Sequence, residues 1–298
     1  MRKQLIEQVK NLVSNKKENS IGFCQIDALT AEISQEMKKG NLTQEDIAEI
    51  NRCFGKDFME HTIQGHGLKK PYGYAGDFLM IDKIYTFHKS KIQEYAIWDT
   101  YFHQHAAPKA VRNRKEYFKE LMHHKIEKNK KIELLNVASG PARDLKELYE
   151  KLAIKSNLRT TCVEMDKNAI VYAKKINKLN LDYIEFIHKN IFSFQTNKQF
   201  DVIWSAGLFD YFDDKAFVTI LRKFREWLKS SGEIVIGNFN ESHNPSRDYM
   251  EIFGEWELNH RTEANLKELA KEAGFYEWQI SVGKEHEQVN LFLHISMY

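Results

Sequence analysis

The chain has 298 residues, of which 42% are hydrophobic, 29% are charged and only 4 are proline, a composition typical of one large or two modest globular domains. Its 44 basic and 42 acidic residues give a net charge of +2 and alternate along the chain, so nothing global indicates nucleic-acid binding. Three scattered cysteines, Cys24, Cys53 and Cys162, favour reduced thiols in a cytoplasmic protein. We find neither a signal-peptide pattern nor an apolar run of the ~20 residues that a membrane span needs.

Residues 1–126 are predicted to form an N-terminal helical domain that acts as a lid or substrate domain. Thr43 and Asp46 have the spacing of a capping box, and the apolar residues that follow share one helical face. A glycine-rich interruption separates this helix from helical stretches at 81–98 and 111–122. The interruption contains Gly65, Gly67, Pro71, Gly73 and Gly76. The charged segment 127–131 is predicted to link the two halves of the chain.

From residue 127 to 298 the pattern changes to alternating strands and helices. Strands are predicted at 132–137, 160–165, 183–187, 200–204, 233–237, 278–282 and 289–296. The clearest helical stripe runs from Phe217 to Leu228, with Asp213 as its N-cap and Gly232 as its C-terminal stop. The alternation predicts an α/β domain whose parallel strands are joined by right-handed crossovers. Ligands of such sheets bind at the carboxyl ends of the strands.

The first strand is followed by the small residues Ala138, Ser139 and Gly140, which allow a ligand to approach the backbone closely. A dinucleotide site needs a third small residue where the helix packs on the strand, but Arg143 stands there. This turn therefore disfavours NAD, whereas an S-adenosylmethionine (SAM) site tolerates the arginine because SAM has no pyrophosphate.

Three later strand ends supply further candidates for cofactor binding. Glu164 and Met165 follow the second strand, where a carboxylate can accept hydrogen bonds from both ribose hydroxyls. The neighbouring Asp166 is a candidate helix cap. Asn190 and Ile191 follow the third strand and suit the edge and face of an adenine. Ala206 and Gly207 follow the fourth strand and again permit close approach.

The run from Ile132 to Ser296 resembles the class I SAM-dependent methyltransferase fold in the order and spacing of its elements. In the first family motif, Asn136, Ala138 and Ala142 stand where an acidic residue and glycines are usual. Four shorter runs are similar to a bacterial subgroup described as hydroxy fatty acid methyl ester synthases. They are Pro71–Asp77, Ala206–Tyr211, Gly237–Phe239 and Asn244–Arg247. The resemblance implies a Rossmann-like sheet, mostly parallel with a final antiparallel strand, and SAM as cofactor.

Methyl transfer from a sulfonium mainly requires alignment of the reactants and exclusion of water. A carboxylate acceptor is its own nucleophile and needs only cations or donors that hold one oxygen. The candidates are Arg247, Arg261, Arg112 and Arg114 as cations, and Tyr72, Tyr74 and Asn238 as donors. A hydroxyl acceptor needs a base, for which Asp210 is the candidate, with Tyr211 beside it. We assign Asp210, Tyr211 and Arg247 as catalytic, and Tyr72, Asn238 and Arg261 as substrate-binding.

The segment from Tyr72 to Asp77 is predicted to be a lid whose glycines permit unusual backbone angles; a packed loop is the alternative. Tyr74, Asp77 and Arg112 are assigned to the cofactor. Asp77 would receive the ammonium of SAM or cap the following helix, and Arg112 would hold the cofactor carboxylate or remain solvated.

The leading functional prediction is O-methylation of a small-molecule carboxylate to a methyl ester. Two alternatives remain, namely methylation of a hydroxyl or nitrogen of a small metabolite, and a nucleoside-binding interaction module without catalysis. No metal site is expected, because the close histidine pairs lack the i, i+4 spacing with a glutamate that a zinc helix requires. A nucleic-acid partner is not expected, and a homodimer is a possible assembly.

Overall fold

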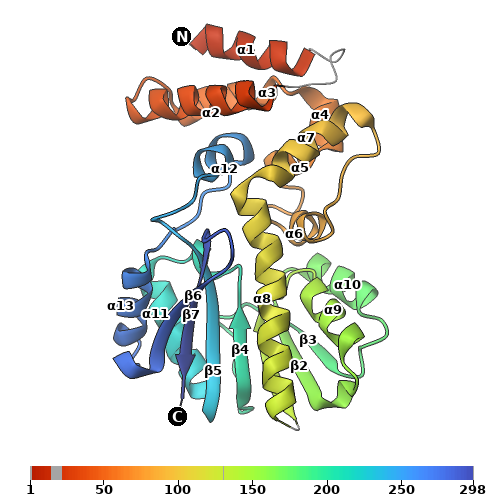
Figure 1. The fold of residues 1–298 in the computed structure, drawn as a ribbon, viewed down its shortest axis with the longest axis vertical. Helices are drawn as coiled ribbons and strands as arrows, with labels where there is room; N and C mark the ends of the chain where they lie inside the picture. The colour runs from red at the N-terminus through yellow and green to blue at the C-terminus, as the bar shows by residue number, and fades with distance from the viewer. Residues whose placement is uncertain (1, 15–21, 130, 298) are drawn as a thin grey trace. The chain divides into compact units, whose positions relative to one another are not determined.

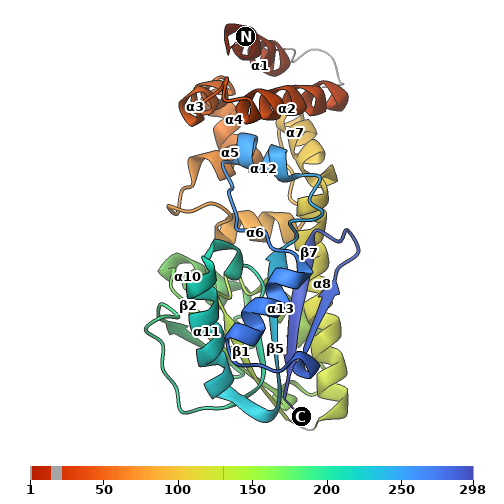
Figure 2. The same ribbon diagram turned by 90° about the vertical axis from the view of Figure 1, so that its left-hand side faces the viewer.

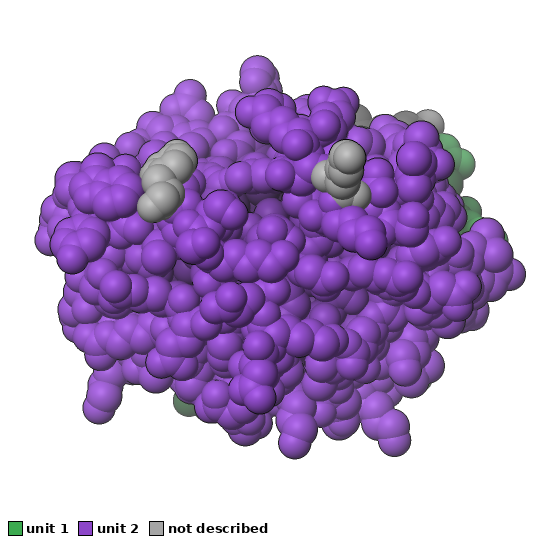
Figure 3. Space-filling model, turned by 90° about the horizontal axis from the view of Figure 1, so that it is seen from below, with its two compact units in different colours: residues 1–108, 245–257 green, residues 109–244, 258–298 purple. Residues whose placement is uncertain are grey.

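The computed structural model describes residues 2–14, 22–129 and 131–297, which divide into two compact units (Figures 1 and 3). Unit 1 contains residues 1–108 and 245–257, and unit 2 contains residues 109–244 and 258–298. This division differs from the predicted boundary at 126/127. It falls inside the continuous helix α8 (Ala106–Lys128), where the composition does not change. Residues 245–257 belong to unit 1 because they form hydrogen bonds with its helices. For example, the Asn51 side chain donates to the Ile252 carbonyl at 2.8 Å.

Unit 1 is helical, as the sequence predicted. Its helices are α1 (Arg2–Ser14), α2 (Phe23–Lys38), α3 (Gln44–Arg52), α4 (Gly55–His61), α5 (Ile63–Lys69), α6 (Phe78–Tyr85), α7 (Gln93–Gln104) and α12 (Arg247–Gly254). The expected capping box is confirmed at the start of α3, where the Thr43 and Asp46 side chains each accept from the other's backbone N–H. Phe54, Phe58, Trp98 and Phe253 form edge-on and tilted ring contacts in the core of this unit.

The predicted glycine-rich interruption was wrong over its first part, because Gly65 and Gly67 lie inside helix α5. Gly65 is required by packing. A Cβ at this position would lie 2.4 Å from the Cα of Met59 in α4, closer than any real contact. Thr62 caps α5 by accepting a hydrogen bond from the Gly65 N–H at 2.9 Å. The irregular part of the segment begins only at Lys70, where α5 ends in a left-handed conformation.

Unit 2 contains a seven-stranded sheet in the order β3-β2-β1-β4-β5-β7-β6. The strands are β1 (Ile132–Val137), β2 (Leu158–Glu164), β3 (Ile184–His188), β4 (Phe200–Ser205), β5 (Leu228–Phe239), β6 (Ile280–Lys284) and β7 (Asn290–Ser296). Strands β1 to β5 are parallel, and β7 pairs antiparallel with both β5 and β6. The chain order reverses between β1 and β4, so the carboxyl ends of these two strands form the switch point where ligands bind in such sheets.

Helices cover both faces of this sheet (Figures 1 and 2). On one face, the unit 2 part of α8 joins α9 (Arg143–Lys151) and α10 (Lys167–Ile176) around Leu134, Cys162 and Trp204. On the other face, α11 (Asp214–Trp227) and α13 (Glu263–Glu272) pack around Leu135, Ile203 and Ile236. Because successive side chains of a strand point to opposite faces, this burial on both sides explains the nearly continuous apolar strands.

Of the two residues predicted to bound α11, the N-cap is confirmed and the C-terminal stop was wrong. Asp213 is the N-cap, and its side chain accepts from the Ala216 N–H at 2.8 Å. Gly232, however, lies within β5, because α11 ends at Trp227 and the chain passes directly into the strand.

The connection from β3 to β4, residues 189–199, contains no helix, and short 3-10 turns occur at 155–157, 209–211 and 277–279. Across the described ranges, no helix is both long and apolar enough to cross a membrane.

Candidate functional site

The turn after β1 places three residues in the left-handed region of backbone conformation. Their φ angles are 53° for Ala138, 51° for Gly140 and 49° for Ala142. Glycine adopts this region most readily, and alanine does so at a cost, so the two alanines keep a glycine-like backbone at positions where the resemblance led us to expect glycines. The turn is held to β2, since the Ala138 N–H donates to the Val163 carbonyl at 2.8 Å.

Glu164 stands at the carboxyl end of β2 and links its own loop to this turn. One carboxylate oxygen accepts from the Gly140 N–H at 2.9 Å, and the other accepts from Met165 and Asp166 at 2.8 and 2.9 Å. The side chain is 6% exposed, and burial raises the pKa of Glu164 despite these three bonds. A carboxylate offers about four acceptor positions, so one remains for a ligand hydroxyl and a second hydroxyl would replace a backbone N–H.

Two features of this edge fit a nucleoside cofactor with an amino-acid tail. A Cβ built on Gly140 would meet no atom within 4 Å, so space remains beside its backbone. Asn136, at the end of β1, is 2% exposed, yet its Nδ2 has no hydrogen-bond partner within the described residues. A buried amide without a partner is costly, and a ligand carboxylate or hydroxyl would satisfy it.

The structure separates the roles of the remaining residues on these loops. Asp166 is the N-cap of α10 and accepts from the Asn168 N–H at 2.8 Å, while Met165 is 64% exposed beside Glu164. Asn190 accepts from the Phe192 N–H at 2.9 Å within its own turn. Ile191 is buried in the core that α11 covers, so its side chain is committed to packing rather than open to an adenine.

Ala206 and Gly207 follow β4, as predicted. The Ala206 carbonyl accepts from the guanidinium of Arg114 in α8 at 2.7 Å, and a Cβ on Gly207 would lie 3.2 Å from the same Nη1 atom. A Cβ on Gly237 at the neighbouring end of β5 would lie 2.8 Å from the Ala206 carbonyl oxygen. Small residues are therefore needed where β4 and β5 end.

Asp210, predicted as a base, is 2% exposed in the turn after β4. Its Oδ1 accepts from the Phe239 N–H at 2.6 Å. Burial raises the pKa of Asp210 to about 6, and the charges of Arg114 and Arg261 only partly oppose this rise. Its neighbour Tyr211 is 41% exposed.

The predicted substrate-binding roles of Arg261 and Asn238 are not supported by their contacts. Arg261 is 4% exposed, and its three nitrogens donate to the Asp214 carboxylate, the Asn238 amide oxygen and two backbone carbonyls. Asn238 is fully buried, and its Nδ2 donates to the Asn259 carbonyl at 3.0 Å. Both side chains hold the loops after β4 and β5 together, so neither has atoms left for a substrate.

The other predicted residues divide between the two units. Arg112 belongs to unit 2 and is half-buried, which lowers the pKa of its guanidinium, while Glu287 opposes this effect. Tyr72, Tyr74, Asp77 and Arg247 belong to unit 1. Tyr74 is 38% exposed, and the Tyr72 ring lies 4.5 Å from the Phe78 ring. Arg247 is exposed and pairs with Glu251 one turn along α12 at 2.7 Å.

Asp77 acts as a helix cap, the second of its two predicted roles. It is 1% exposed and accepts from the backbone N–H groups of Leu79 and Met80 at the start of α6. His66 of α5 contacts both carboxylate oxygens at 2.8–2.9 Å. With Gly73 and Gly76 at φ angles of 86° and 66°, the loop before Asp77 turns sharply and is fixed at its end.

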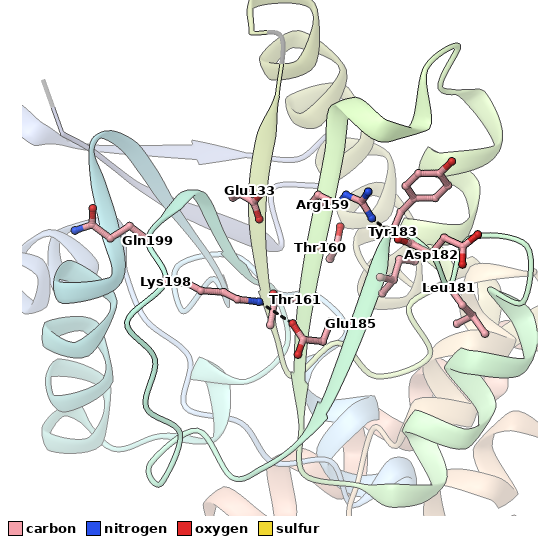
Figure 4. A pocket seen from close by; sticks show the side chains of 11 residues that line it. Glu133, Arg159, Thr160, Thr161, Leu181, Asp182, Tyr183, Glu185, Lys198 and Gln199 are labelled. Atoms are coloured by element: carbon pink, nitrogen blue, oxygen red, sulfur yellow. Dashed lines mark hydrogen bonds and ion pairs between the residues drawn. The ribbon is translucent and has the colours of Figure 1, made fainter.

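The opposite edge of the sheet carries a pocket of about 710 Å³ (Figure 4). It lies at the amino ends of β1, β2 and β3. The connection from β3 to β4, which contains no helix, also contributes to its lining. Its charged lining is mixed, with Glu133, Arg159, Asp182 and an ion pair between Lys198 and Glu185. In the part of the chain that the structure describes, no three His, Cys, Asp or Glu side chains are grouped as metal ligands.

Sequence reasoning missed two of the polar groups at the carboxyl edge. Asn136 was noted only as a departure from a motif, and Asp144 was not considered. Asp144 is 7% exposed in the first turn of α9, and burial raises its pKa to about 6, although Arg114 and Lys115 oppose this rise. A polar residue within a buried strand or on the inner face of a helix is the signal that would have found both.

Comparison with known proteins places the domain in a family. A family model described as a methyltransferase domain matches residues 128–288, more than half of the chain. No curated protein sequence matches the chain. A possible exported protein from Bordetella parapertussis is similar in structure, with 14% identity over 99% of this chain and 95% of that chain and a TM-score of 0.64. The SAM-dependent methyltransferase SibL has 14% identity over 89% and 77% and a TM-score of 0.51.

At 14% sequence identity, the similarity to these two structures shows only the fold. The match to the family model also shows the family. The chain belongs to the methyltransferase domain family and is a SAM-dependent methyltransferase. The fold class predicted from the sequence is therefore confirmed.

Proposed function

We propose that this methyltransferase transfers the methyl group of SAM to the carboxylate of a fatty or hydroxy acid and so forms a methyl ester. The observation that carries this proposal is the burial and hydrogen bonding of Asp210, the candidate general base at this edge of the sheet. It is 2% exposed and accepts a 2.6 Å hydrogen bond from the Phe239 N–H. A general base must reach the proton that it removes, so this arrangement disfavours hydroxyl acceptors.

A carboxylate acceptor avoids this difficulty because it carries its own nucleophilic oxygen. Bound SAM supplies a methyl group activated by a sulfonium. An acceptor oxygen forms a bond to the methyl carbon while the carbon–sulfur bond breaks and its electron pair goes to sulfur, and no proton has to leave. The protein has to hold the reactants in line and exclude water. We propose that Arg112 holds one acceptor oxygen or the cofactor carboxylate.

For the cofactor itself, we propose that Glu164 accepts from the ribose and that the Asn136 amide donates to the amino-acid end. The turn from Ala138 to Gly140 and the residues Ala206 and Gly207 would offer backbone that a ligand can approach closely. Each of these residues belongs to unit 2.

The test is an acceptor series assayed with SAM for S-adenosylhomocysteine and for methylated product by mass spectrometry. Short, medium and long fatty and hydroxy acids would be compared with phenols and primary amines. We expect methyl esters, with kcat/KM rising with the chain length of the acid. Turnover of phenols or amines without turnover of any acid would contradict the carboxylate assignment.

We also propose a cytoplasmic location and leave a homodimer as a prediction. Cys24, Cys53 and Cys162 are free thiols, as expected in a reducing compartment. Light scattering of the purified chain measures its mass directly and decides between monomer and dimer.

A further inference from the structure

Arg114 is a buried cation that contacts the backbone at the end of β4. It is 5% exposed and projects from α8, which precedes the sheet in the chain. Its Nη1 donates to the Ala206 carbonyl at 2.7 Å, and a Cβ on Gly207 would lie 3.2 Å from the same atom. The guanidinium therefore lies directly against the two residues that follow the strand.

Two buried carboxyl groups lie within electrostatic range of this guanidinium. Asp144 lies in the first turn of α9, next to the turn that follows β1, and Asp210 lies in the turn that follows β4. Burial raises the pKa of each to about 6, and the charge of Arg114 opposes that rise in both. Arg114 is thus a cation shared by the loops of the two strands at the switch point.

We propose that Arg114 is a positioning residue for methyl transfer, which fixes the end of β4 against the turn after β1 so that both loops present one cofactor-binding arrangement. A lysine would keep the charge but lacks the planar, rigid guanidinium that holds the Ala206 carbonyl at a fixed angle. The proposal concerns cofactor binding and does not depend on which acceptor is methylated.

The experiment measures the SAM dissociation constant by calorimetry, and the melting temperature, for four variants of the full chain. They are Arg114→Lys, Arg114→Met, Asp144→Asn and the double variant Arg114→Met/Asp144→Asn. Arg159→Met, at the amino end of β2, is the matched control. Hydrogen exchange of peptides covering 138–142 and 206–212 reports the order of the two loops.

We expect Arg114→Met to weaken SAM binding by about tenfold or more and Arg114→Lys by a smaller factor, with faster exchange in both loops. Replacing Arg114 with methionine leaves two buried carboxyl groups without their shared cation, so the melting temperature of Arg114→Met should fall. The double variant removes one of those carboxyls and should regain much of the melting temperature while SAM binding stays weak. The control should bind SAM within about twofold of wild type.

A different pattern would overturn the proposal. If Arg114→Met melts lower but binds SAM like wild type at temperatures where it is folded, Arg114 is only structural. The same holds if the double variant regains affinity along with stability. Should Arg114→Met not fold, Arg114→Lys decides. Unchanged SAM affinity and unchanged hydrogen exchange of both loops in Arg114→Lys would then exclude the positioning role.

Discussion

Buried polar side chains at the strand ends of unit 2 differ in whether their atoms are satisfied by the protein. Arg261 and Asn238 use their side-chain atoms on neighbouring loops. Asn136 leaves one amide nitrogen without a partner in the described structure. Residue type alone does not separate these cases, because an arginine or asparagine after a strand suits a ligand or a loop equally well. Only the three-dimensional contacts do so, and those of Arg261 and Asn238 give no support for a substrate-binding role.

Arg261→Met should destabilise the protein. The variant leaves the Asp214 carboxylate, the Asn238 oxygen and two carbonyls without their donor, so we expect a loss of about 3 kcal/mol or more in the free energy of unfolding. Arg247→Met is the matched control, because Arg247 is exposed and makes a surface pair worth at most about 1 kcal/mol. Urea denaturation measures both, and equal effects would contradict the structural role of Arg261.

Asp144→Asn should change the pH dependence of stability. The pKa of Asp144 is about 6 in the folded chain, against 3.8 for an ordinary aspartate. A raised folded pKa gives stability that is complete below the unfolded pKa and is lost as the pH rises through the folded pKa. Wild type therefore loses up to about 3 kcal/mol from this group between about pH 4 and 6, and the asparagine variant does not.

Unfolding of both proteins at pH 4.5 and 7.5 tests this sign. Relative to wild type, Asp144→Asn should be more stable at the higher pH than at the lower one. A difference between the two proteins that stays constant across the range, or that moves the other way, would show that Asp144 is not buried as a carboxylic acid.

At the scale of elements, caps and periodic apolar faces carried the prediction well, whereas glycines were ambiguous. Thr43 and Asp213 cap the helices they were predicted to cap. Gly65 and Gly232 were interpreted as breaks but lie within a helix and a strand. A glycine can be required by an unusual backbone conformation or by the close packing of a neighbouring element, and the sequence alone does not tell these two causes apart. At Gly65 the deciding fact is the closeness of Met59, which belongs to another helix.

Gly65→Ala and Gly67→Ala form a matched pair within α5. A methyl group at position 65 would lie 2.4 Å from the Met59 Cα, so α4 and α5 must separate and we expect a loss of about 2 kcal/mol or more. At position 67 its nearest neighbour is the flexible end of Met80 at 3.4 Å, so alanine should be neutral or stabilise by up to about 1 kcal/mol. Thermal melts of the two variants should therefore differ clearly, and similar values would refute the packing explanation.

At the scale of the whole molecule, the alternation of strands and helices was sufficient to predict the α/β sheet. It did not predict that residues 245–257 leave unit 2 and form helix α12 of unit 1. That assignment rests on long-range contacts, including the Asn51 bond to Ile252 and the pair of Lys70 with Glu255 at 3.1 Å. Such contacts join segments about 200 residues apart, beyond the reach of local patterns.

The most direct test of the cofactor site is calorimetric titration of the full chain with SAM, S-adenosylhomocysteine and NAD. Glu164→Ala is the test variant, and Asp166→Ala, which removes a helix cap two residues away, is its control. We predict saturable binding of both adenosyl ligands, no binding of NAD, and an affinity at least about tenfold weaker in Glu164→Ala but within about threefold of wild type in the control. Binding of NAD in place of SAM, or full SAM affinity in Glu164→Ala, would contradict a cofactor site at the carboxyl ends of β1 and β2.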